Sequence, residues 1–253
     1  MNHRQYLREL PGSECAVVFL HGILESPEQF EDFVDSVKER VSIFNLLLPG
    51  HGAAAEDFAA SGVEKWRDYV FAWMERLEKQ YSWIILVGHS MGSLLAMEAA
   101  IRFPKKVCAL FLMAVPLYIR VKPEGVLNTF KVLSRRARQR DAIVLAAQRA
   151  FSVRCESPVF LFRWIPRYLE LFCMASSDRD LVCRLPCPAI VYQSGKDEFV
   201  GKRSADCLKN APQISVKTAA RSRHFYYLPQ ERKEILSAFH QLLRKTAGLA
   251  ESL

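Results

Sequence analysis

Short apolar runs that alternate with amphipathic patterns set the strongest limit on how this chain can fold. The runs are rich in Val, Ile and Phe, which is typical of buried strands in a parallel sheet. Between most of them, apolar residues recur at helical spacing. The alternation predicts an α/β fold with a mainly parallel sheet flanked by helices. The expected strands are 16–20, 41–47, 83–87, 107–114, 189–193 and 214–218.

Composition excludes several other classes of protein. The chain has 253 residues, of which 50% are hydrophobic and 25% charged, with a mean hydropathy near zero, so it can bury a sizeable core. No window reaches the roughly 18 apolar residues of a membrane span, and the start, MNHRQYLREL, lacks the apolar region of a secretory signal. We therefore expect a soluble cytoplasmic protein, either a monomer or a dimer.

One long segment interrupts the alternation. Residues 117–186 contain helical patterns without a convincing strand, and a stretch of about 70 residues is too long for a loop in a compact domain. We expect a helical insertion there, called the cap segment (residues 117–186), and a core made of residues 1–116 and 187–253.

The cap segment holds most of the chain's excess positive charge. It has 13 Lys and Arg against six Asp and Glu, a net +7 of the chain's +8. Arg135, Arg136, Arg138 and Arg140 crowd one stretch of it. Such a patch is usually a solvated face, and otherwise we expect at most weak contact with anionic lipid. No nucleic-acid partner is expected, because no known binding module accompanies the charge.

The cysteines do not form a recognisable framework. They are seven in number and lie mostly in apolar contexts, so we expect buried free thiols. Cys183 and Cys187 are the nearest pair, but they lack the second Cys or His pair of a zinc site. We predict no metal site and no cofactor.

The string GHSMG, residues 88–92, is the sharpest chemical signal. It matches G-x-S-x-G, follows the apolar run WIILV and opens into the helical pattern SLLAMEAAIRF, as a nucleophile elbow requires. At such a turn Ser90 should have a strained backbone, and Gly88 and Gly92 should leave room where strand and helix nearly touch. The alternative is an ordinary turn with an incidental serine.

A serine nucleophile needs a base, and the base needs a carboxylate. Of the six histidines, His224 is the best candidate, because it follows the last expected strand in the loop RSRHFYYLP. Asp197 is the favoured acid, because it lies in the turn GKDEFVG after the expected strand 189–193. Glu198 is its rival. Two backbone donors should stabilise an oxyanion: the N–H of Met91, after the nucleophile, and that of Ile23, after Gly22 in FLHGIL.

The ordered set HGIL, LPGHG, GHSMG, GKDEFV and RHFYYLP resembles the α/β-hydrolase superfamily over nearly the whole chain. The phrase MAVPLYIR and the short cap are most similar to bacterial carboxylesterases and monoacylglycerol lipases. This resemblance implies an α/β-hydrolase fold with a small helical cap inserted after the sixth core strand, here 107–114. It also implies hydrolysis of a small-molecule ester, with a short- to medium-chain acyl group or a monoacylglycerol, through an acyl-enzyme. Where the family more often has a small residue before the catalytic histidine, this chain has Arg223, which leaves the triad intact and would narrow the site or add a charge beside it.

Aromatic residues of the cap segment are the candidates for binding substrate. We single out Tyr118, Phe160 and Trp164; most cap aromatics, however, should simply pack the insertion against the core. The motifs leave other reactions open, since an aminopeptidase, amidase or thioesterase would have the same triad. A non-catalytic binding protein is disfavoured because all three triad positions are filled.

Overall fold

The computed structural model describes residues 3–38, 40–133, 142–153 and 159–246. In this part of the chain, one sheet has the strand order β1-β3-β2-β4-β5-β6-β7, and β1 is antiparallel to its neighbour while the others are parallel. The strands are β1 (Tyr6–Arg8), β2 (Cys15–Leu20), β3 (Ser42–Leu46), β4 (Trp83–His89), β5 (Val107–Met113), β6 (Ala189–Ser194) and β7 (Ile214–Ala219).

All six strands expected from the sequence are confirmed, with ends that differ by at most two residues. The strand β1 was not expected, because it has only three residues and they are mostly exposed, without an apolar alternation. The number of the strand that precedes the cap segment has to be corrected. It follows β5, the fifth strand of the described sheet rather than the sixth, because only β1 precedes β2.

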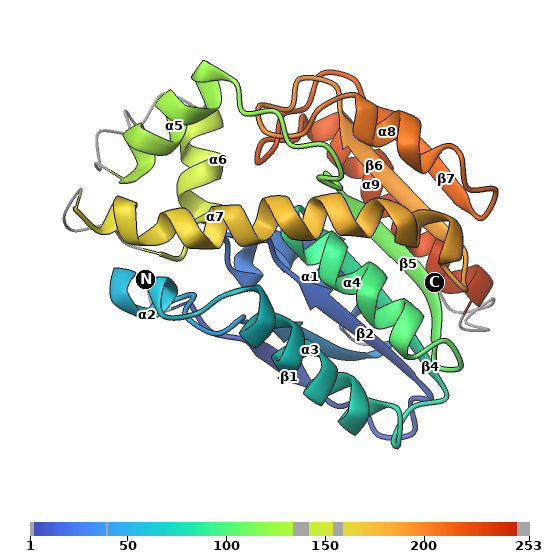
Figure 1. The fold of residues 1–253 in the computed structure, drawn as a ribbon. Coiled ribbons are helices and arrows are strands. Elements are labelled where there is room, and N and C mark those ends of the chain that lie inside the picture. Colours follow the sequence, from blue (N-terminus) through green and yellow to red (C-terminus); the bar gives the residue numbers. More distant parts are fainter. Residues whose placement is uncertain (1–2, 39, 134–141, 154–158, 247–253) are drawn as a thin grey trace.

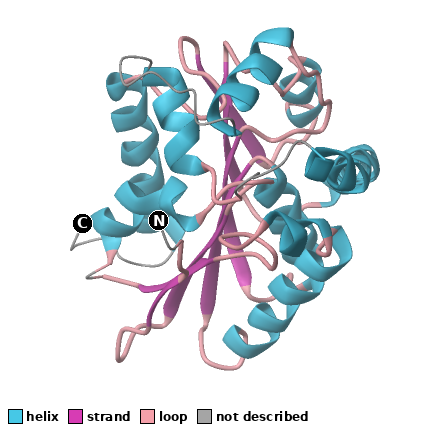
Figure 2. Ribbon diagram, turned by 90° about the vertical axis from the view of Figure 1, so that its left-hand side faces the viewer, coloured by secondary structure: helices cyan, strands magenta, loops and turns pink. Residues whose placement is uncertain are grey.

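Helices cover both faces of the sheet, and Figure 2 shows the strands between two helical layers. The face that packs on α1 (Glu31–Val37) and α9 (Pro229–Thr246) receives Val17 and Phe19 of β2. The opposite face receives Ala16, Val18 and Leu20 of the same strand. This face packs on α2 (Ala55–Ala59), α3 (Val63–Leu77), α4 (Met91–Arg102) and α8 (Arg203–Leu208). Because neighbouring residues of a strand point to opposite faces, one apolar run fills both cores.

The described parts of the cap segment are mainly helical. They form α5 (Pro123–Leu133), α6 (Ala142–Ala150), α7 (Val159–Ser177) and the 3₁₀ helix η2 (Asp178–Arg184). In Figure 1, α7 runs across the molecule, and it contacts α2, α3 and α4. Trp164 is fully buried at this contact, where its Nε1–H donates to the Ala55 carbonyl oxygen at 3.1 Å and its ring meets Phe58. Among the described helices, none is both long enough and apolar enough to cross a bilayer.

The end of α6 is tied to the loop after β2. Phe151 forms an isolated antiparallel bridge with Glu25, and the Ser152 N–H donates to the Leu24 carbonyl oxygen at 2.8 Å. Ser152 Oγ also donates to the Glu25 carbonyl oxygen at 2.5 Å. Leu24 has a φ of 64°, which is unfavourable for a residue with a branched side chain, so these bonds help to hold the loop in that conformation.

One expectation about individual residues changes with the structure, and another falls outside the described residues. The cysteines Cys15 and Cys187 are buried as expected, but Cys173 and Cys183 are exposed because they lie on outward faces of the cap helices. The basic cluster Arg135, Arg136, Arg138 and Arg140 lies outside the described residues, as does Cys155.

Candidate active site

Ser90 lies in the turn between β4 and α4. Its φ of 51° and ψ of −123° confirm the strained backbone expected of an elbow, and its N–H donates to the Met113 carbonyl oxygen of β5 at 2.9 Å. A Cβ on Gly88 would lie 2.6 Å from Ser93 Cα, and one on Gly92 would collide with the Leu20 carbonyl oxygen. The predicted need for glycine at both positions is therefore confirmed: strand and helix leave no room for a side chain.

His224 and Asp197 form a buried pair at the carboxyl end of the sheet. The Nδ1 of His224 lies 2.9 Å from Asp197 Oδ2 and 3.1 Å from Oδ1. Oδ1 also accepts the N–H groups of Phe199 and Val200, at 2.8 and 2.9 Å. Because a carboxylate only accepts, the Nδ1 of His224 carries a proton and its Nε2 is left to act as a base.

Each member of this pair shifts the pKa of the other in the direction that favours its charged form. Burial alone would lower the pKa of His224, but the charge and hydrogen bond of Asp197 outweigh it and raise that pKa above its ordinary value. Burial alone would raise the pKa of Asp197, and the His224 ring with two backbone donors lowers it instead. Asp197 can therefore stabilise an imidazolium on His224.

Glu198, the rival acid, contacts the backbone of His224 and not its ring. Its Oε2 accepts the His224 N–H at 3.1 Å, and its Oε1 accepts Arg223 Nη1 at 2.8 Å. Arg223 Nη1 also donates to Glu124 at the start of α5. Two carboxylates thus neutralise Arg223, which joins the cap segment to the loop of His224 and adds no net positive charge beside the ring.

Two backbone N–H groups remain available near Ser90. In the described part of the chain, neither Ile23 N–H nor Met91 N–H has a hydrogen-bond acceptor. Gly22 packs close to the elbow, since a Cβ on it would lie 2.9 Å from Ser90 Cβ. The two N–H groups singled out from the sequence are thus unbonded among the described residues, and the residue before Ile23 packs against the nucleophile.

Ser90 Oγ is not hydrogen-bonded to His224 Nε2 in this structure, as far as the described residues go. The residue next to Ser90, His89, has its ring 5.0 Å from that of His224. Nucleophile and base contacts of this kind are often long before substrate binds and shorten in the reacting complex.

His21 and His51 have scaffold roles, because their ring nitrogens are hydrogen-bonded to backbone groups of the loops that follow β2 and β3. His21 donates from Nδ1 to the Gly22 carbonyl oxygen and accepts the Leu48 N–H at Nε2, at 2.9 and 3.0 Å. His51 accepts the Leu24 N–H at 3.2 Å. Burial lowers the pKa of His21 to about 4 and holds that of His51 well below its ordinary value, so both rings stay neutral.

Glu25 is a buried site residue that sequence reasoning missed. It lies three residues after Gly22, and its carboxylate contacts His89, which directly precedes Ser90. Glu25, His89 and His224 place donor atoms within 4.8 Å of one another, a set that could hold a metal ion. Each of these side chains is already hydrogen-bonded to a protein group. We therefore interpret the three residues as part of a hydrogen-bond network.

The aromatic rings nearest to His224 differ from those singled out in the sequence. Phe225 and Phe199 have ring centroids 4.7 and 5.1 Å from that of His224, and Phe151 lies 5.1 Å from Phe225. All three come from segments that converge on the site: the loop after His224, the acid turn and the end of α6.

Two of the substrate-binding residues proposed from the sequence, Tyr118 and Trp164, have their described contacts away from the triad. Tyr118 is covered by the guanidinium groups of Arg179 and Arg203, at 4.0 and 4.6 Å from its ring. Trp164 packs α7 against α2, and the side chain of Phe160 lies outside those described. The described contacts of Tyr118 and Trp164 include none with Ser90, Asp197 or His224. Phe162, another cap aromatic, is 74% exposed and faces away from the core.

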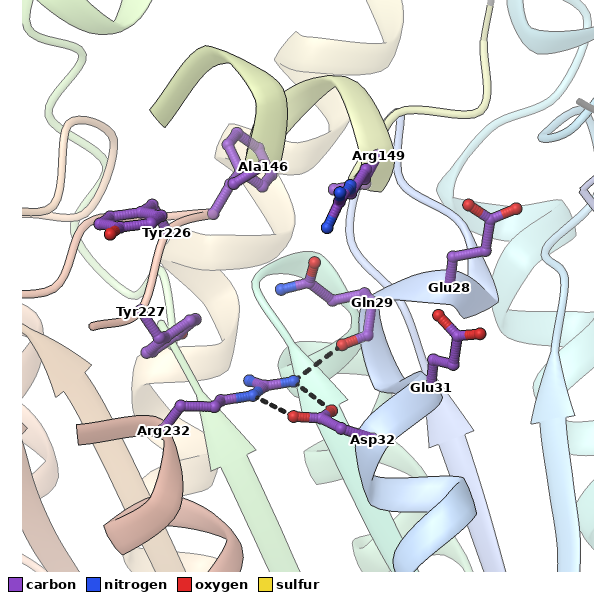
Figure 3. A pocket seen from close by; sticks show the side chains of 11 residues that line it. Glu28, Gln29, Glu31, Asp32, Ala146, Arg149, Tyr226, Tyr227 and Arg232 are labelled. Carbon is purple, nitrogen blue, oxygen red and sulfur yellow. Dashed lines mark hydrogen bonds and ion pairs between the residues drawn. The ribbon is translucent and has the colours of Figure 1, made fainter. Parts of the chain in front are cut away.

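A pocket of about 290 Å³ opens between α6 and the loop after His224. Figure 3 shows Arg149 of α6 and Tyr226 at its rim, and Arg232 bound to Asp32 and to the Gln29 carbonyl oxygen at its base. Phe225 lines it, but Ser90 is not among its described lining residues. The pocket therefore reaches the residue that follows His224, and neither His224 nor Ser90 is one of the described residues that line it.

Comparison with known proteins agrees with this geometry. A model of the family described as "Alpha/beta hydrolase family" matches residues 17–238. The chain belongs to the alpha/beta hydrolase family. The resemblance seen in the motifs is thus confirmed at the level of the family, and the fold with it.

Individual relatives of this alpha/beta hydrolase are more distant. It is 29% identical over 113 residues to a pimeloyl-(acyl-carrier protein) methyl ester esterase of Nitrosomonas europaea, covering 44% of this chain and 42% of that protein. It is 31% identical over 135 residues to the probable lysophospholipase BODYGUARD 1 of Arabidopsis thaliana, covering 48% of this chain and 26% of that protein. These matches thus span less than half the length of either relative.

Solved structures match this alpha/beta hydrolase over almost its whole length. A structure from work on LipS and LipT, two metagenome-derived lipolytic enzymes, has a TM-score of 0.74 at 22% identity and covers 96% of this chain and 98% of that one. The monoacylglycerol lipase of Paleococcus ferrophilus has a TM-score of 0.65 at 16% identity, with the same coverage. At these identities the likeness shows the fold.

Proposed function

We propose that this alpha/beta hydrolase is a serine hydrolase that cleaves carboxylic esters through an acyl-enzyme on Ser90. One observation carries the proposal: a strained serine follows His89, whose ring lies 5.0 Å from that of a histidine with its Nδ1 fixed by a carboxylate, and two backbone N–H groups near the serine are free in the described part of the chain. A nucleophile, a base and an oxyanion hole are the parts that acyl transfer needs.

The proposed reaction has two halves. Ser90 Oγ attacks the ester carbonyl carbon while His224 Nε2 takes its proton, and Ile23 and Met91 N–H stabilise the oxyanion. The intermediate collapses, the carbon–oxygen bond to the alcohol breaks, and His224 gives its proton to the leaving alcohol. Water then attacks the acyl-enzyme, passes its proton to His224, and the acid leaves as Ser90 regains a proton. Asp197 stabilises the imidazolium in both halves.

The substrate class proposed is short- to medium-chain acyl esters or monoacylglycerols. Support comes from the similarity to an esterase and to lipolytic enzymes, and from the apolar rings of Phe151, Phe199 and Phe225 beside His224. We propose that residues 117–186 act as the cap over this acyl site, since Phe151 and the Arg223–Glu124 pair join it to the catalytic loops.

The first test is hydrolysis of p-nitrophenyl esters from C2 to C16 by the wild type and by Ser90→Ala. Loss of activity by several orders of magnitude in the variant supports the mechanism, and the chain-length optimum gives the acyl preference. Equal rates in both proteins would overturn it. Acyl-CoA and aminoacyl amides assayed in parallel separate an esterase from a thioesterase, an amidase or an aminopeptidase, and inactivity on every substrate would favour a binding protein.

A further inference from the structure

Glu25 is almost completely buried, at 1% exposure, and makes hydrogen bonds in two directions. Its Oε2 accepts the Gly22 N–H at 2.8 Å, within the loop that carries Ile23. Both carboxylate oxygens face His89 Nδ1, at 2.8 and 2.9 Å. Burying an ionised carboxylate costs free energy unless hydrogen-bond donors surround it. The Gly22 N–H and the His89 ring are the groups that offset this cost for Glu25.

The other side of the His89 ring fixes where its protons lie. His89 Nε2 is 3.1 Å from the backbone carbonyl oxygen of His224. Because a carbonyl oxygen can only accept, Nε2 must carry a proton, and the Nδ1 contact with Glu25 needs a second one. Burial alone would raise the pKa of Glu25, but the charge and hydrogen bond of His89 outweigh it and lower that pKa, so Glu25 accepts as a carboxylate. The His89 ring therefore faces a hydrogen-bond acceptor at each of its two nitrogens.

We propose that Glu25 and His89 form an imidazolium–carboxylate pair that positions the catalytic groups of the site. The pair joins three segments: the oxyanion loop through Gly22 N–H, the nucleophile elbow through the place of His89 before Ser90, and the base loop through the His224 carbonyl oxygen. This inference rests on the proposed function. Both residues act through others, so they are positioning residues.

The effect on the oxyanion hole follows from the loop itself. Glu25 N–H donates back to the Gly22 carbonyl oxygen at 3.2 Å, while the Glu25 carboxylate holds the Gly22 N–H. With both polar groups of Gly22 engaged, the next N–H, that of Ile23, is left free. Loss of the carboxylate frees Gly22 N–H in a buried place, and the loop must turn to satisfy it.

Two variants separate hydrogen bonding from mere occupancy. Glu25→Gln keeps the pattern, because its Oε1 can accept Gly22 N–H and its amide N–H can donate to a neutral His89 Nδ1. Glu25→Ala leaves both partners unsatisfied. We expect Glu25→Ala to lower kcat about 30- to 100-fold with KM changed less than about threefold, as for a partly lost oxyanion donor, and Glu25→Gln to stay within about fivefold of the wild type.

Glu98→Ala is the matched control, since it also removes a largely buried carboxylate of an ion pair, here with Arg67, two turns along α4 from Ser90. It should lower Tm and leave kcat unchanged. Retention of kcat within threefold by Glu25→Ala, or an equal loss in Glu25→Gln and Glu25→Ala, would overturn the positioning role. Inactivity of the wild type on all esters would instead contradict the proposed function.

A spectroscopic measurement tests the pair without any substrate. In ¹⁵N NMR at pH 7.5, with signals assigned by comparison with His89→Gln, both ring nitrogens of wild-type His89 should carry protons. In Glu25→Gln only Nε2 should. A neutral His89 ring in the wild type would refute the imidazolium–carboxylate pair, even where Glu25→Ala does not fold.

Discussion

Asp197→Asn should abolish the proposed activity while leaving the protein folded, and the hydrogen bonds show why. Asp197 Oδ1 accepts two backbone N–H groups, from Phe199 and Val200, and an amide can keep both only by placing its own oxygen there. Its NH₂ group then takes the place of Oδ2, 2.9 Å from His224 Nδ1. Because NH₂ donates, Nδ1 must become the acceptor and the ring proton must move to Nε2, where it blocks acceptance of the Ser90 proton.

The wrong tautomer should lower kcat on the order of 10⁴-fold, which corresponds to about 5 kcal/mol in the barrier. The assay is steady-state hydrolysis of p-nitrophenyl butyrate at pH 7.5, with Tm as a check on folding. Glu198→Gln is the matched control, because it changes the neighbouring carboxylate, which touches the His224 backbone and not the ring; we expect less than about a tenfold loss. Activity of Asp197→Asn within tenfold of the wild type, or a larger loss in Glu198→Gln, would refute this assignment of the acid.

Three further predictions concern pH and packing. His224 must be neutral to act as base and its pKa is raised, so kcat/KM should fall on acidification through an apparent pKa above 6.5, measured as a pH–rate profile; a midpoint below 6.5 would contradict it. Burial lowers the pKa of His21 from 6.5 to about 4, so on acidification the unfolded state binds a proton before the folded state does. The free energy of unfolding should therefore be unaffected by His21 above about pH 6.5 and fall by roughly 3 kcal/mol towards pH 4. Urea unfolding midpoints that do not decline over that range would count against this prediction. Trp164→Ala should lower the free energy of unfolding by about 3–5 kcal/mol, whereas Phe162→Ala, at an exposed position of the same helix, should change it by less than about 0.5 kcal/mol; equal effects in chemical denaturation would show that α7 is not anchored through Trp164.

The sheet and the order of the candidate triad could be predicted from the sequence because both depend on local patterns. Buried parallel strands appear as uninterrupted apolar runs, and the carboxyl ends of such strands share one edge of the sheet, so Ser90, Asp197 and His224 were expected at the same edge. The strand β1 gave no such pattern, since three exposed residues at a sheet edge need no apolar face.

What the sequence could not supply is the path of side chains between segments. Glu25 looks like an ordinary surface carboxylate of a polar turn, and only the packing of Gly22 against the elbow brings it under His89. Trp164 was expected at the substrate and instead packs on α2, because helical spacing gives the faces of α7 but not which face meets the core. The sequence held one signal for the pair: an acidic residue, Glu25, three positions after Gly22, together with a histidine directly before Ser90.

The bonds between Ser152 and the loop after β2 limit how freely the cap segment can be exchanged. The carbonyl oxygens of Leu24, whose backbone is left-handed, and of Glu25 both accept hydrogen bonds from Ser152. The conformation of the loop that holds Ile23 therefore depends in part on the cap segment. A chimaera that replaces residues 117–186 with another helical insertion must therefore provide a donor pair at this position. Without one, a graft meant to change only substrate preference will also loosen the oxyanion loop.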